Sequence, residues 1–101
     1  MKIANKKAWL KVQSQEPFKG SNLHATNENG LYIVWSYNWA PLYVHDEREG
    51  LWYENKTKYS YSTSRQKSQC FQRVIDTVLM SHDEIKALID KKRTINSLQI
   101  A

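Results

Sequence analysis

The sequence is poor in cysteine, glycine and proline, and it has no long apolar run. With Cys70 as its one cysteine, the chain cannot form an internal disulfide or a cysteine-based structural zinc site. Three glycines and two prolines exclude flexible linkers and low-complexity segments. No apolar stretch approaches the roughly 20 residues of a membrane-spanning helix, and lysines interrupt the apolar residues that an export signal would need. We therefore expect a cytoplasmic protein without membrane association.

Length and composition indicate one globular unit. The 101 residues are enough for a single domain, 1–101, and not for two of ordinary size. Hydrophobic residues make up 41% and charged residues 25%, which excludes a disordered chain of one charge sign. Lys and Arg number 15 against 10 Asp and Glu, so the net charge is +5. An aromatic content of 12% leaves rings available for an interface, and a homodimer is among the expected assemblies.

The first half of the chain has the period of β-strands. Residues 8–13 are predicted as a short strand, and 16–30 as a polar loop that ends in the turn signal Asn29-Gly30. Alternation makes 31–39 the clearest strand, and Ala40-Pro41 is expected to break it because proline lacks the ladder donor. Three more strands are predicted: 42–45 and 51–54, which form a hairpin around the charged turn 46–50, and 58–62.

The second half changes to the period of helices. Apolar residues at helical spacing predict one helix, with Thr63 or Ser64 as its N-cap and a buried face formed by Phe71, Val74, Ile75, Val78 and Leu79. Ser81 and Glu84 form a capping box for a second helix, whose apolar stripe is Ile85, Leu88 and Ile89. The sequence thus predicts an α+β domain: a four- to five-stranded, mostly antiparallel sheet followed by two C-terminal helices packed on one face.

Most aromatic residues gather between positions 32 and 61. The odd-numbered side chains of the central strand, from Leu31 to Trp39, are predicted to form the core under the helices, with Ile75 and Val78 packed on Trp35. Three rings then fall on the outer face of the sheet, where they would serve as a partner surface or as a platform for stacking bases: Tyr32, Tyr43 and Trp52.

A basic, hydroxyl-rich segment contains no acidic residue between positions 55 and 75. It runs into a predicted helix N-terminus, where free backbone N–H groups and the helix dipole favour anions. We therefore predict an anion-binding or partner-binding surface formed by Lys56, Lys58, Ser60, Ser62, Thr63, Ser64, Arg65 and Lys67. A solvated loop ahead of a capped helix is the alternative interpretation, because isolated basic stretches are common on protein surfaces.

Catalytic and metal-binding patterns are scarce. The three histidines lie in separate segments, and no HExxH, GxSxG or P-loop motif occurs. Cys70 beside Phe71 is predicted to be a small buried hydrophobic residue rather than a nucleophile. Asp46, Glu47 and Glu49 are predicted to form a solvated turn rather than a cation site, because EF-hand spacing is missing. We expect no catalytic residue, no metal and no cofactor.

Two segments carry a resemblance. Residues 36–44 read SYNWAPLYV, and residues 58–66 read KYSYSTSRQ. The first resembles the SY-x-TP-I/V-A strand and turn, and the second the YS-x-TTSKH segment, of small uncharacterised proteins in bacteriophages and mobile elements. The chain departs from this pattern: Ala40 stands in place of Thr, one extra residue lies between Tyr37 and Pro41, and Gln66 replaces the final His. The resemblance implies a phage or mobile-element origin and a host-cytoplasm location, and it implies no mechanism.

These observations predict a small non-enzymatic binding protein of phage or mobile-element type. Its expected partner is a host protein or a nucleic acid. One alternative is single-stranded nucleic-acid binding through the basic and aromatic surface. An alternative of another class is an enzyme that acts on a phosphorylated substrate at 60–64, although no positioned base stands out in that segment.

Overall fold

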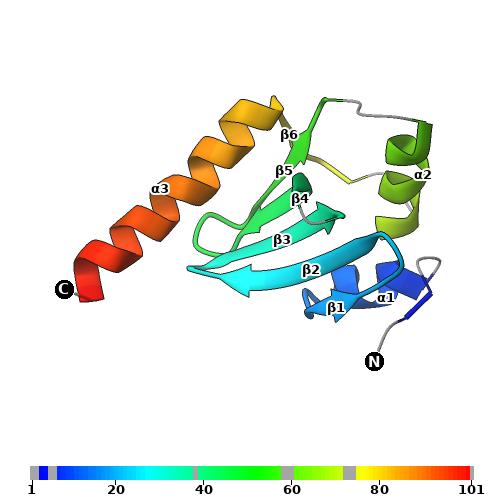
Figure 1. Cartoon of the computed structure of the whole chain (residues 1–101), viewed down its shortest axis with the longest axis horizontal. Helices are drawn as coiled ribbons and strands as arrows, with labels where there is room; N and C mark the ends of the chain where they lie inside the picture. The colour runs from blue at the N-terminus through cyan, green and yellow to red at the C-terminus, as the bar shows by residue number, and fades with distance from the viewer. Residues whose placement is uncertain (1–2, 5–6, 38, 58–60, 72–74, 101) are drawn as a thin grey trace.

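The computed structural model describes residues 3–4, 7–37, 39–57, 61–71 and 75–100, without the side chains of 61–64 and 96–100. Over these residues, six strands pair in chain order into one sheet (Figure 1). Each neighbouring pair is antiparallel except β5 and β6, which are parallel. The elements are α1 (Ala8–Gln13), β1 (Phe18–Lys19), β2 (Leu23–Glu28), β3 (Leu31–Ser36), β4 (Ala40–Asp46), β5 (Leu51–Asn55), α2 (Tyr61–Cys70), β6 (Val78–Met80) and α3 (His82–Ile100). The predicted α+β class with a mostly antiparallel sheet is confirmed, but the sheet has more strands than predicted.

Helices cover both faces of the sheet. On one face, α1 and α2 pack on a core cluster that includes Val12, Val34 and Cys70. On the other face, α3 packs through Ile85 and Ile89 on a second cluster (Figure 1). The prediction of two C-terminal helices on one face is wrong, because α2 and α3 lie on opposite faces and α2 precedes the last strand.

β3 is the central strand, and all six of its residues are buried. Leu31, Ile33 and Trp35 belong to the cluster under α3, as the odd-numbered alternation predicts. Tyr32 and Val34 belong to the cluster under α1 and α2. The strand therefore has no solvent-facing side, and each of its faces needs its own layer of helix.

The predicted core does not continue beyond this strand. β3 ends at Ser36, so Tyr37 and Trp39 lie in the following turn, where they are 54% and 55% exposed. Tyr37 has a φ of 56°, a left-handed conformation that turns the chain out of the strand. Its N–H donates to the Asn22 carbonyl at 2.8 Å. The prediction that Tyr37 and Trp39 are core residues is wrong, because the backbone turns before it reaches them.

β4 accommodates Pro41 through a β-bulge. The register between β3 and β4 shifts after Val34, which leaves Leu42 as an extra residue on β4. Leu42 and Tyr43 consequently both join the cluster under α1 and α2. β4 pairs with β5 only from Tyr43 onward, and beyond that point Asn55 Nδ2 donates to the Pro41 carbonyl at 2.8 Å. Pro41 thus lies inside a strand, and the break predicted there is wrong.

Both predicted tight turns are confirmed. Asn29 and Gly30 connect β2 to β3 with φ values of 53° and 81°, a region that glycine enters without steric cost. The turn between β4 and β5 is stabilised by the buried Asp46, whose carboxylate accepts the backbone N–H of Arg48 at 3.0 Å and of Glu49 at 3.2 Å.

The N-terminal predictions are wrong. Residues 8–13 form α1 rather than a strand, because Ala8 and Val12, four positions apart, are the residues that pack against the sheet. The loop predicted at 16–30 contains β1 and β2. In β2 the buried apolar residues are Leu23 and Ala25, an alternation too short to stand out in a polar segment.

The boundary between strands and helices is also displaced. Of the strand predicted at 58–62, residues 58–60 lie outside the described residues and 61–62 begin α2. Residues 71 and 75–77 are not helical and Val78–Met80 pair with β5, so the prediction that the helix continues to Leu79 is wrong; Val74 of its predicted buried face lies outside the described residues. Val78 is 43% exposed, and Ile75 lies beside Trp52 and Phe71 on the opposite face of the sheet, so the predicted packing of both residues on Trp35 is wrong. Short runs of branched apolar residues fit a strand as well as a helix face.

The start of α3 is confirmed in detail. The Glu84 N–H donates to Ser81 Oγ at 3.2 Å, and the Ser81 N–H donates to Glu84 Oε1 at 3.0 Å, which completes the capping box. These hydrogen bonds lower the pKa of the Glu84 carboxyl. The predicted stripe also holds: Ile85 and Ile89 are fully buried, and Leu88 packs against them.

A truncation in this stripe tests the α3 layer. Ile89→Ala should lower the free energy of unfolding by about 2–5 kcal/mol, because the side chain is fully buried and leaves a cavity. Ile95→Ala on the same helix removes a side chain that is 40% exposed and should cost much less. Urea denaturation of both variants measures the difference. Equal losses would contradict the packing of α3 on the sheet.

Candidate binding pocket

Aromatic rings form a continuous layer on the sheet face under α1 and α2. Trp52 makes edge-to-face contacts with Tyr32, Tyr43 and Phe71, with ring centroids 6.2, 6.3 and 5.1 Å away. Tyr43 and Phe71 also meet edge to face at 4.9 Å. This arrangement is favoured by the ring quadrupoles and holds the rings in fixed orientations.

The three rings predicted to face outward are therefore part of a core. Tyr32 and Tyr43 are 3% and 6% exposed, and Trp52 is half-buried. Burial raises the pKa of both tyrosines well above the usual value. The Tyr32 hydroxyl donates to the Glu16 carbonyl at 2.9 Å, which ties the chain after α1 to the sheet. The expectation of an exposed stacking platform at these rings is wrong, because α1 and α2 cover that face.

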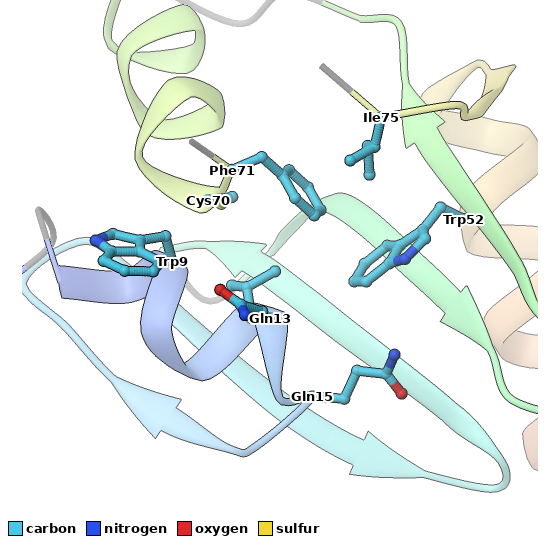
Figure 2. A pocket seen from close by; sticks show the side chains of 8 residues that line it. Trp9, Gln13, Gln15, Trp52, Cys70, Phe71 and Ile75 are labelled. Carbon is cyan, nitrogen blue, oxygen red and sulfur yellow. The ribbon is translucent and has the colours of Figure 1, made fainter. Parts of the chain in front are cut away.

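A pocket of about 600 Å³ remains between the two helices (Figure 2). One side is formed by α1, which places Trp9, Val12 and Gln13 at helical spacing of three and four, so that all three lie along the pocket. Gln15 follows just after the helix, with a φ of 53°. Ala8 and Val12 anchor the same helix in the core, which fixes the position of the Trp9 ring.

The other side of the pocket comes from β5 and from the chain after α2. Trp52 and Phe71 lie next to each other on this side, in edge-to-face contact, with Ile75 near them and Cys70 at the end of α2 (Figure 2). Among the described residues, the lining consists of three aromatic rings, two aliphatic side chains, one thiol and two amides, without a charged side chain. Such a pocket can take an apolar or aromatic group and offer it one or two amide hydrogen bonds.

Cys70 is 1% exposed, as predicted. Burial raises the pKa of its thiol to about 12, an effect that the nearby charge of Lys67 partly offsets. The Cys70 Sγ–H donates to the Gln66 carbonyl at 3.3 Å, one turn earlier in α2. The thiol is therefore protonated at neutral pH, which fits a packing role.

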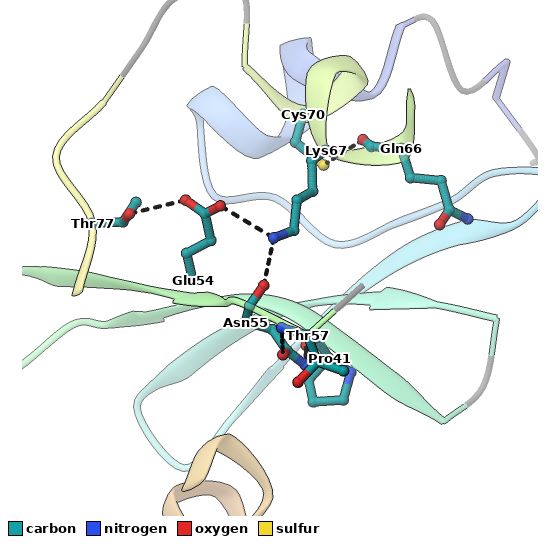
Figure 3. A network of polar contacts seen from close by, with 8 residues as sticks. All are labelled: Pro41, Glu54, Asn55, Thr57, Gln66, Lys67, Cys70 and Thr77. Atoms are coloured by element: carbon teal, nitrogen blue, oxygen red, sulfur yellow. Dashed lines mark hydrogen bonds and ion pairs between the residues drawn. The ribbon is translucent and has the colours of Figure 1, made fainter. Parts of the chain in front are cut away.

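A polar network holds α2 against the end of β5 (Figure 3). Lys67 Nζ forms an ion pair with Glu54 Oε2 at 3.1 Å and donates to the Asn55 carbonyl. The Thr77 hydroxyl donates to the second Glu54 oxygen at 2.9 Å. Asn55 Oδ1 accepts the Thr57 N–H at 2.9 Å. These contacts position both ends of the crossover between β5 and β6, and with them the pocket wall at Phe71 and Ile75.

A buried glutamine anchors the other side of α2. Gln66 is 2% exposed; its Oε1 accepts the Ser36 hydroxyl at 2.8 Å and its Nε2 donates to the Asn22 carbonyl at 3.1 Å. All of its side-chain contacts lie far away in the sequence. For that reason the sequence did not identify Gln66 as a structural residue.

Of the predicted basic segment, the structure describes the side chains of Lys56, Arg65 and Lys67. Lys67 is engaged with Glu54, whereas Lys56 and Arg65 are exposed. Lys58 and Ser60 lie outside the described residues. Three hydroxyl residues lie in the first turn of α2, which begins before the predicted cap, and their side chains are not described: Ser62, Thr63 and Ser64.

A second cavity of about 510 Å³ lies beside the turns at one end of the sheet. His45 lines it and contacts the Trp52 ring at 4.9 Å. Its buried Nδ1 has no hydrogen-bond partner among the described residues. The remaining lining is mostly polar and comes from the loops around Asn29 and Glu47.

Neither a metal cluster nor a membrane span is found in the described part of the chain. There, no three His, Cys, Asp or Glu residues are grouped as a metal site requires, and no helix has the length and apolarity to cross a bilayer.

Comparisons with known proteins place the chain in no established group. No family model, no curated protein and no solved structure matches it. The likeness to phage and mobile-element proteins therefore stays a prediction.

The burial of Cys70 has a direct chemical test. A thiol reagent at pH 8 should label the native protein far more slowly than the urea-unfolded protein, because the thiol is both covered and protonated. Labelling followed by mass spectrometry gives both rates. Native labelling as fast as that of the unfolded chain would contradict the burial of Cys70 and reopen the nucleophile interpretation.

The ion pair of α2 should contribute measurably to stability. Lys67→Met leaves the Glu54 carboxylate and the Asn55 carbonyl without their shared donor, and should cost about 1–3 kcal/mol. Lys56→Met removes a neighbouring exposed lysine and should change stability by less than about 0.5 kcal/mol. Thermal denaturation of the two variants gives the comparison. A Lys67→Met variant as stable as Lys56→Met would show that the network is dispensable.

Proposed function

We propose that the protein is a non-enzymatic binding protein and that its site is the pocket between α1 and α2. A partner protein inserts one apolar or aromatic side chain between Trp9, Trp52 and Phe71. The observation that carries this proposal is a hollow of about 600 Å³ whose described lining residues are mostly aromatic and aliphatic and include no charged side chain. Ligand-binding clefts typically enclose about 300–1,000 Å³ and are mostly apolar with a few polar groups.

The energetics of protein interfaces support a protein partner. A few anchor side chains in desolvated pockets usually carry most of the binding free energy, and aromatic residues dominate among them. The Trp52 and Phe71 rings are held edge to face, so little side-chain entropy is lost when an anchor enters. Gln13 and Gln15 supply amides for the backbone of the inserted segment or for a polar group at the tip of the anchor.

Other features favour this proposal over those made from the 56–67 segment. Lys67 has its charge neutralised by Glu54, and the tyrosines expected to stack on bases are buried. Cys70 in the pocket is protonated and hydrogen-bonded within its own helix. A host protein, the first of the partners expected from the sequence, is accordingly the partner class we propose for this site.

Panning a displayed peptide library tests the pocket without knowledge of the natural partner. Peptides enriched on the wild-type protein should share one large apolar or aromatic position. Trp9→Ala should weaken their binding by about 30-fold or more, the effect of losing about 2 kcal/mol at a hot spot. Leu10→Ala is the matched control, because Leu10 is the next residue of α1, is 48% exposed and does not line the pocket.

Two outcomes would overturn this proposal. One is an enriched set without a common apolar position. The other is an equal loss of binding for Trp9→Ala and Leu10→Ala while both variants keep the wild-type melting temperature. A second copy of this chain is another partner to be tested. Sedimentation of the free protein shows whether it forms such a dimer.

A further inference from the structure

α3 leaves part of its own face of the sheet uncovered. It packs on β4 and β5 (Figure 1). Ile85 and Ile89 belong to the core cluster beneath it. On β1 and β2 the side chains of the same face are Lys19, His24, Thr26 and Glu28, which are exposed or half-buried. Leu23 and Ala25, which alternate with them, point to the opposite core.

Rings and cations follow one another along this open face. His24 pairs across the strands with Trp35 and stacks on it, with centroids 6.2 Å apart and planes within 10°. The side chain of Lys86 in α3 also lies over the Trp35 ring, with its Nζ 5.8 Å from the ring centroid. Lys19 lies opposite His24 on the neighbouring strand. Burial lowers the pKa of the His24 imidazole, and the positive charge of Lys19 lowers it further.

The row continues at the turn between β3 and β4. Trp39 is 55% exposed, and its ring lies 6.1 Å from that of His82, one turn before Lys86 in α3. The His82 N–H donates to Thr57 Oγ1 at 3.2 Å, which brings the exposed Lys56 to the same end of the helix. We call this set the α3-side row: Lys19, His24, Trp35, Trp39, His82 and Lys86.

We propose that the α3-side row binds single-stranded nucleic acid. Lys19 and Lys86 of the row would contact phosphates, together with the neighbouring Lys56. The exposed Trp39 ring would stack on an unpaired base. Strand spacing of about 4.8 Å separates Trp35, His24 and Lys19, so this part of the row extends over two such steps across the sheet, perpendicular to the strands. Basic groups alternating with aromatic faces are the arrangement that single strands require.

Most acidic groups beside the row are already engaged. Arg93 forms a bidentate contact with Glu28, with Nε 2.7 Å from Oε1, and lies 3.8 Å from Asp90. Glu84 is turned into the capping box. Asp83, Glu84 and Asp90 of α3 are all exposed. Asp83→Asn removes one of these acidic groups and should therefore strengthen binding.

A single strand fits better than the other polyanions. In a duplex the bases are stacked on each other and offer no free face to Trp39. An acidic peptide would use the lysines but would gain nothing specific from the exposed ring. The row also lies on the opposite face of the sheet from the pocket between α1 and α2, so it is independent of the function proposed for that pocket.

The test is a fluorescence anisotropy titration of labelled oligonucleotides, a thymine homopolymer and a duplex of equal length, at two salt concentrations. The single strand should bind more tightly and weaken as salt rises. Trp39→Ala should reduce its affinity roughly 5- to 150-fold, the range for one lost stacked base, and Trp39→Phe should retain most of it. Lys19→Gln with Lys86→Gln should lower the salt slope by about 1.4, because each single-strand phosphate contact contributes about 0.7.

The matched control is the double variant Lys7→Gln and Arg65→Gln. It removes the same net charge from exposed positions at α1 and in α2, away from the row, and should leave the salt slope nearly unchanged. Melting temperatures establish that every variant is folded. If Trp39→Ala is unfolded, the proposal is tested by Trp39→Phe and by the comparison of the two double variants.

Four results would overturn the proposal. The first is that no oligonucleotide binds at low salt. The second is that duplex and single strand bind equally and Trp39→Ala has no effect, and the third is that the two double variants have equal salt slopes. The fourth is that polyglutamate displaces the oligonucleotide equally well from the wild type and from Trp39→Ala. The last result would identify an acidic peptide surface instead.

Discussion

The burial of β3 on both faces is the constraint on which the rest of the structure depends. A strand whose six residues are all buried has to be covered twice. Tyr32 and Val34 require α1 and α2, while Leu31 and Ile33 require α3. α1 has six residues and would not be stable as an isolated helix in water. The helices thus owe their stability to the strand that they cover, and both proposed binding surfaces lie where that cover is incomplete.

Elements defined by local chemistry could be predicted from the sequence. The Asn29-Gly30 turn, the hairpin of β4 and β5 and the capping box at Ser81 each depend on residues within a few positions of one another. Elements defined by distant contacts could not. α2 has almost no apolar stripe, and it is held by Gln66 and Lys67, whose partners lie on other elements. Likewise, the spacing of the apolar residues over 71–80 fits both a helix and a strand. Pairing with β5 is what makes Val78–Met80 a strand.

The candidate pocket could be predicted only in fragments. Trp52, Cys70 and Phe71 attract attention as rings and as the lone thiol, but the sequence places them on different elements with different roles. Trp9 and Gln13 join them because 8–13 is a helix, and the alternation there imitates a strand. Within the α3-side row, Trp39 was wrongly assigned to the core. It continues the alternation of β3 in sequence, while the backbone turns away from the core at Tyr37.

The parallel pairing of β6 has a consequence for the order in which the chain folds. β1 to β5 form a meander of neighbouring antiparallel strands, each closed by a short connection. β6 can join only after the chain over 56–77 has crossed the sheet, and this larger loop costs more closure entropy. We therefore expect the meander to form first, with β6 and the start of α3 added afterwards. During that interval the edge of β5 is open, so it is the point at which a nascent chain is most exposed to wrong strand pairing.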